Sequence, residues 1–171
     1  MMKRVLFSLA VMSCLVFSAG AAEKVSWPVW FAFNDSQDID MLGLRVNLFS
    51  GECEQVTGMD LGFIGRSQYY YGIQLNLLVN SVTDRMAGWQ IGLGYNEVGV
   101  SDPFSLQVGL WNQAQEMRGI QCGFVNLADY STGLQVGLIN RTEAMYGFQV
   151  GLINVIRGGH VPFMPLLNIG F

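Results

Sequence analysis

The residues that could carry chemistry are few in this chain and lie far apart. The only histidine is His160, in a glycine-rich turn. Nucleophilic catalysis needs a nucleophile and a base within hydrogen-bonding reach, and zinc sites need cysteine and histidine at characteristic spacings. Cys53, Cys122 and His160 match neither pattern, and Glu52 and Glu54 offer only two loop carboxylates to calcium. We therefore expect no catalytic residue, no metal site and no cofactor, and no disulfide between Cys53 and Cys122.

One pair of charged residues does carry information about structure. Arg45 and Asp60 occupy the same position of two consecutive sequence repeats, in segments that are otherwise uncharged. A single buried charge is very costly, and a neighbouring opposite charge offsets part of that cost. We therefore predict that Arg45 and Asp60 form a cross-strand ion pair inside the fold.

The repeat that contains them sets the architecture. Its clearest copies are G-L-Q-V-G-L-I-N at 133–140 and G-F-Q-V-G-L-I-N at 147–154, and looser copies run back to 43. Arg45 and Asp60 stand where later copies have Gln, and successive copies of this position are 14 to 17 residues apart. A period near 14 is too short for helical repeats and suits one strand plus a turn of about five or six residues. The Asn that ends most copies is expected to start that turn.

Alternation within each copy predicts strands with two unlike faces. In the copy at 133–140, Leu134, Val136 and Leu138 point one way, and Gly133, Gln135 and Gly137 point the other. In a soluble barrel the Gln/Gly face would meet water and would normally carry Lys and Glu, but these strands carry almost none. We therefore expect the apolar face to meet lipid and the Gln/Gly face to line a narrow interior. Aromatic residues toward the strand ends, including the run 69–71, suggest interfacial girdles.

Eight repeat copies, with a strand at 27–33 before them and one at 163–171 after them, give ten strands. An even number suits closure, which removes exposed sheet edges. We therefore predict an all-β fold, an antiparallel meander closed as a ten-stranded outer-membrane β-barrel. A soluble barrel and a β-solenoid, which stacks one repeat per rung, are the alternatives.

The N-terminus reads as a secretory signal. Lys3 and Arg4 precede an apolar run, and Ala19-Gly20-Ala21 offers a cleavage pattern. We expect a signal peptide at 1–21 and a single repeat-built β domain at 22–171. Seven basic and 13 acidic residues then remain, which argues against nucleic acid as a partner.

The repeated G-[LIF]-Q-[VIL]-G-[LF]-[IVW]-N resembles the short surface-repeat family of Gram-negative bacteria, including the leptospiral-type surface repeat proteins. The resemblance covers about 43–171, although the copies at 43 and 58 lack the Gln. It implies placement at the surface or in the outer membrane, and it implies no enzymatic activity.

The end of the chain resembles an outer-membrane assembly signal. Alternate positions hold Phe163, Pro165, Leu167, Ile169 and Phe171, and the pattern finishes on a terminal aromatic residue. This pattern predicts that barrel-assembly machinery reads Phe171.

The sequence therefore predicts a non-catalytic outer-membrane surface repeat protein with a structural or surface-interaction role. Its expected partners are outer-membrane lipid and the barrel-assembly machinery, with the ligand unknown. A soluble periplasmic binding module, and a narrow channel or small-ligand carrier, are the alternative functions.

Overall fold

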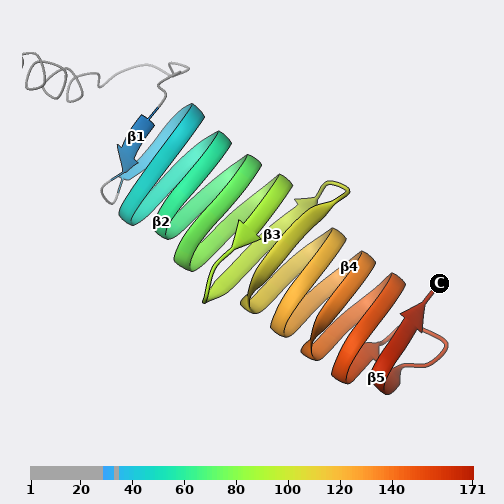
Figure 1. Cartoon of the computed structure of the whole chain (residues 1–171). Coiled ribbons are helices and arrows are strands. Elements are labelled where there is room, and N and C mark those ends of the chain that lie inside the picture. The colour runs from blue at the N-terminus through green and yellow to red at the C-terminus, as the bar shows by residue number, and fades with distance from the viewer. Residues whose placement is uncertain (1–28, 33–34) are drawn as a thin grey trace, which may run out of the picture.

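The protein is a coil of β-structure. The computed structural model describes residues 29–32 and 35–171, and the predicted signal peptide lies outside them. The described residues form strands β1 (Val29–Ala32), β2 (Asp35–Ile91), β3 (Tyr95–Ser101), β4 (Ser105–Ile156) and β5 (Phe163–Gly170), with no helix. The two long strands wind like a spring from β1 at one end to β5 at the other (Figure 1).

Neighbouring rungs of this coil run parallel. β1 pairs with β2 so that Val29 lies beside Leu44, and β2 pairs with β4 so that Gln90 lies beside Gln107. β3 continues the same stacking between β2 and β4. Equivalent positions of successive repeats are therefore neighbours, which is the arrangement of a β-solenoid. Among the described strands, β5 alone runs antiparallel, along the last rung of β4.

The prediction of an all-β fold is confirmed, but the predicted antiparallel meander closed as a ten-stranded barrel is wrong. The sheet is open and mixed, and no closed barrel is found among the described strands. The physical reason lies in the residues taken for turns. They continue the alternation as a second side of each rung, where Asn126 and Ala128 are buried and Asp129 is exposed. Parallel stacking also places each polar side chain beside the equivalent side chain of the next repeat. An antiparallel meander would not place equivalent residues side by side along every strand.

Each rung has an interior filled from both sides. One side contributes the Gln positions and the other contributes Asn and then small or apolar residues. The apolar part of this interior includes Val56, Tyr70, Met86, Val98 and Met117. Asn therefore does not start a turn as predicted but lines the interior.

The rungs start at a glycine whose backbone only glycine adopts readily. φ is +134° at Gly58 and Gly133 and +146° at Gly147. In the rung that starts at Ser105 the left-handed residue is instead Phe104, with φ of 69°. This irregular rung follows the short break at 102–104, where the repeat spacing widens.

Candidate binding face

Polar side chains form two hydrogen-bonded ladders inside the coil. In the first ladder, each Gln donates from Nε2 to Oε1 of the Gln one rung earlier, as in Gln121 to Gln107 at 2.8 Å and Gln135 to Gln121 at 2.7 Å. In the second ladder the direction reverses, because Asn126 donates to Asn140, one rung later, at 2.8 Å. Buried amides need such partners, and the parallel stacking supplies them.

The Gln ladder ends at the predicted ion pair. Arg45 donates to Asp60 through Nε at 2.9 Å and through Nη2 at 2.6 Å, and neither side chain is exposed. Asp60 also accepts hydrogen bonds from Asn47, Gln74 and Asn76. Burial opposes the Arg45 charge, but the hydrogen bond and attraction of Asp60 outweigh it and raise the pKa of Arg45. The predicted interior pair is present, inside a solenoid rather than a barrel.

These ladders leave little space within the rungs. A Cβ added to Gly137 would overlap the carbonyl oxygen of Gly123 and lie 2.6 Å from Nδ2 of Asn126. The glycines are therefore packed tightly against the backbone of the preceding rung and against the Asn ladder. A channel along this part of the coil has no room, because amide groups occupy the space.

The outward residues on the Gln side of each rung form an apolar face. We define this face as three rows of side chains that stack along the coil. The first row is the residue before the Gln position of each repeat, the second is the residue after it, and the third lies two residues further on. The third row is half exposed along the whole coil, at Leu48, Phe63, Leu77, Leu93, Leu110, Phe124, Leu138 and Leu152. The first row adds exposed Trp89, Ile120 and Phe148. Large contiguous apolar surfaces of this kind mark interaction sites.

The opposite side of the rungs is mostly polar, although it includes the exposed Tyr130 and Tyr146. Its outward residues include exposed Gln113, Gln115, Asp129 and Arg141. Ion pairs join Arg141 and Arg157 to Glu143 there, at 3.2 and 3.1 Å. The coil is therefore amphipathic, with one face suited to an apolar partner and one suited to water.

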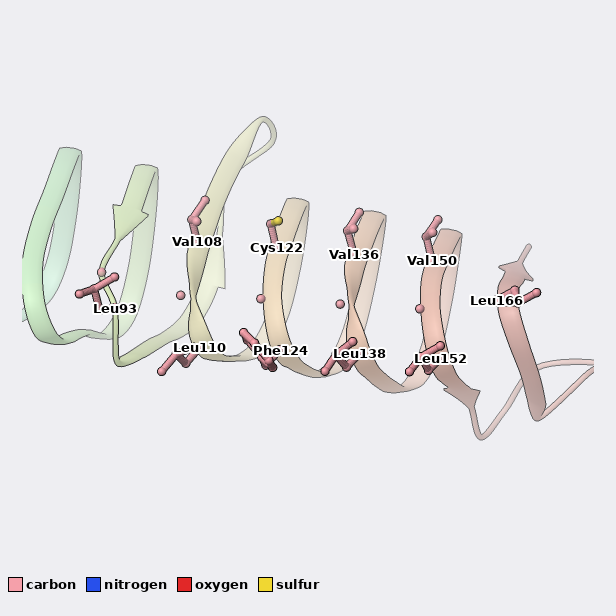
Figure 2. A pocket seen from close by; sticks show the side chains of 15 residues that line it. Leu93, Val108, Leu110, Cys122, Phe124, Val136, Leu138, Val150, Leu152 and Leu166 are labelled. Carbon is pink, nitrogen blue, oxygen red and sulfur yellow. The ribbon is translucent and has the colours of Figure 1, made fainter.

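A groove runs along the C-terminal part of the apolar face. One wall is Val108, Cys122, Val136 and Val150, and the other is Leu110, Phe124, Leu138 and Leu152 (Figure 2). Glycines form its floor, Leu93 and Leu166 lie at its ends, and its volume is about 670 Å³. The groove was not predicted from the sequence. The one indication of it in the sequence is that one outward row has smaller residues in the C-terminal repeats.

The structure does not bring the remaining candidate residues together into a site. The His160 ring stacks on Phe171 with centroids 5.4 Å apart. Cys53 is buried, whereas Cys122 is exposed in the groove wall and forms no disulfide. Within 29–32 and 35–171, no group of His, Cys, Asp or Glu is arranged to hold a metal ion.

One aromatic prediction is wrong. Tyr70 does not belong to an interfacial girdle, because it is fully buried. Its hydroxyl donates to the carbonyl oxygen of Ile73 at 2.6 Å and lies 3.2 Å from that of Gly58. Burial, reinforced by the Asp60 charge, raises the pKa of Tyr70. The alternation of 69–71 places only the middle residue inside.

Comparisons with protein-family models, curated proteins and solved structures found no match for this chain. The resemblance to the surface-repeat family therefore stays a prediction, as does the role of Phe171. Among the described residues, no helix is both long and apolar enough to cross a membrane.

Proposed function

We propose that this protein is an exported, non-catalytic surface repeat protein of the outer membrane, which lays its apolar face on lipid hydrocarbon. The observation that carries this proposal is the unbroken apolar face beside a polar opposite side. Export is supported by the signal-peptide pattern at 1–21.

The size of the apolar face supports lipid as the partner. Eight repeats spaced about 4.8 Å apart, with three outward residues each, give a face of roughly 38 by 13 Å, or about 500 Å² in plan. Half-exposed side chains such as Leu152, which is 60% exposed, project from this plane. At about 25 cal/mol per Å², burying even this plan area would stabilise the bound state by roughly 12 kcal/mol before the costs of association.

The charge of the chain supports apolar rather than electrostatic binding. The net charge is −4, and anionic lipid surfaces attract clusters of Lys and Arg. The third row of the face contains no charged residue along its length. We therefore expect binding to neutral zwitterionic vesicles that is insensitive to salt.

Vesicle flotation tests the proposal. The wild type should float with phosphatidylcholine vesicles at low and high salt. Leu110→Ser, Phe124→Ser and Leu138→Ser together should abolish flotation, because they remove apolar surface from three adjacent rungs. The matched control is Gln115→Ser, Asp129→Ser and Arg141→Ser on the polar side, which should float like the wild type.

Circular dichroism of each variant checks that the coil is intact. A wild type that stays at the bottom of the gradient, or an apolar-face variant that floats normally, contradicts the lipid-binding role. Cell fractionation tests the location, and recovery of the folded protein only in the soluble periplasmic fraction contradicts the outer-membrane assignment.

A further inference from the structure

The groove in the apolar face differs from the rest of that face in the size of one wall. Its inner wall consists of three valines and Cys122. The same repeat position earlier in the chain holds Val46 in the first repeat and the larger Leu61, Leu75 and Ile91 in the next three. Each of these larger side chains would reach further toward the third row and narrow the space between the rows. The groove is thus a feature of particular rungs and not of the repeat as a whole.

We propose that this groove seats a single acyl chain of a membrane lipid, aligned with the axis of the coil. The proposal rests on the proposed function, since it requires the apolar face to meet lipid. It adds to that function a discrete site, in which one acyl chain lies along the axis of the coil.

The chemistry of the lining selects a hydrocarbon. All the lining side chains are apolar, and the floor is glycine. The floor backbone is engaged between rungs, as in the bond from Gly92 N to Val108 O at 2.9 Å. An extended peptide in the groove would find no partner in the lining for its N–H and C=O groups, so nothing in the groove would fix its register. A charged or hydroxylated ligand meets the same difficulty, whereas an acyl chain has no polar group along its length.

The dimensions also suit one chain. The floor glycines run from Gly92 to Gly151 over five rungs, so four rung spacings of about 4.8 Å give a length of roughly 19 Å. One leaflet contributes about half of a 30 Å hydrocarbon core, or roughly 15 Å. The groove has a volume of about 670 Å³ and is open along its outer side. The groove can therefore take the whole of one chain.

The C-terminal end of the groove is closed by a residue in an unusual conformation. Leu166 of β5 lies at this end with φ of 70°, in the left-handed region. β5 pairs antiparallel with the last rung, and Leu166 is opposite Gly151. Figure 2 shows Leu166 beyond Leu152, at the opposite end of the row from Leu93. The chain end would stop against this side chain, which limits the occupant in length.

Cys122 provides a direct readout, because this exposed thiol stands in the groove wall. We would measure its labelling by a water-soluble maleimide, by peptide mass spectrometry, with and without lysophosphatidylcholine monomers below the micelle concentration. These monomers supply one acyl chain each and no bilayer. Labelling should slow about tenfold at roughly 90% occupancy, with one lipid bound per protein.

Two variants locate the site. Val136→Trp fills the groove next to Cys122 and should abolish the lipid-dependent slowing. Leu61→Trp is the matched control, at the same repeat position but outside the groove, and should keep it. For each variant, the rates of Cys122 labelling with and without lipid are compared, so that any direct shielding of the thiol by the introduced Trp ring cancels.

The outcomes separate this proposal from the proposed function. Normal flotation without monomer-dependent protection of Cys122 overturns the groove site and leaves the lipid-binding face intact. Failure of flotation overturns the proposed function itself. Uptake of many monomers per protein, or protection of Cys122 by self-association without lipid, also overturns the single-chain site.

Discussion

At the scale of single residues, the interior of this coil depends on amide groups having partners in the next rung. Gln74 donates to Asp60 at 3.2 Å, and every later Gln of the ladder donates one rung back toward it. The carboxylate therefore accepts at the end of a chain of amides that all point their N–H groups toward it. Arg45 balances its charge, so Asp60 is the residue on which the N-terminal interior most depends.

Replacing Asp60 with alanine should destabilise the protein by about 3–5 kcal/mol, because it leaves the buried Arg45 guanidinium without its counter-ion. Urea unfolding followed by circular dichroism measures the loss. Arg45→Gln combined with Asp60→Gln should recover much of it, because both changes extend the Gln ladder. A double variant no more stable than either single variant would show that the pair does not act as one unit.

Tyr70 should make the fold sensitive to alkali. Burial raises the pKa of its phenol in the folded state, while the unfolded phenol ionises near pH 10. The folded state then keeps a proton that the unfolded state loses, so stability is fully present below about pH 10 and falls as the pH rises further.

Urea midpoints measured between about pH 8 and 11 test this dependence. Tyr70→Phe should cost about 1 kcal/mol at neutral pH for the lost hydrogen bond, but its stability should fall less steeply with alkali. Tyr146→Phe, which changes an exposed tyrosine, should follow the wild type. Equal alkaline slopes in wild type and Tyr70→Phe would assign the sensitivity to another group.

At the scale of the element, each rung depends on the conformation of its first residue. Gly133 has φ of +134°, and an added Cβ would overlap the carbonyl oxygen of Gly119 in the rung before. Backbone strain and close approach therefore act at the same position. The side chain is excluded because the rungs stack directly on one another.

Gly133→Ala should destabilise the coil by about 2–4 kcal/mol, from strain at positive φ and from overpacking. The neighbouring Thr132→Ala changes an exposed side chain and should lie within about 0.5 kcal/mol of wild type. Denaturant midpoints of the two variants provide the measurement. A tolerated alanine at 133 would mean that the rungs can shift apart at little cost.

Prediction from sequence succeeded where it relied on alternation and failed where it relied on turns. Alternation placed Gln135 inside and Leu138 outside, and it identified the partnership of Arg45 with Asp60. The residues after each Asn looked like turns because they carry charges such as Arg141 and Glu143. These charges are the outward residues of a second strand side, and only the stacked structure distinguishes the two cases. The groove was not predicted either, because the smaller residues of one outward row form a continuous wall only when the rungs stack in parallel register.

At the scale of the whole molecule, the rungs form an almost one-dimensional array. Each rung contacts mainly its neighbours, so stability is close to a sum of rung and interface terms. The C-terminal rungs are nearly identical, with Gln121, Gln135 and Gln149 spaced by 14 residues. A complete rung can therefore be removed without disturbing the register of the others.

Deleting residues 119–132 should give a folded, shorter coil. The denaturant m-value should fall by roughly a tenth, in proportion to the surface lost on unfolding. Deleting only 126–132 removes one side of a rung and should prevent folding of the C-terminal part, because the ladders lose register. Circular dichroism and urea titration distinguish the two deletions, and equal damage by both would contradict the modular array.

The antiparallel direction of β5 affects whether copies of the chain can associate end to end. An array of identical rungs is a template, since its last open edge offers hydrogen bonds and Gln149 Oε1 still lacks a donor. A strand from another copy of the chain, if it ran parallel, could extend such an edge without limit, as in cross-β fibres. β5 pairs with this edge in the antiparallel direction, and its Pro165 has no N–H to donate to a further strand. The reversal thus opposes the end-to-end growth that the parallel register would otherwise favour.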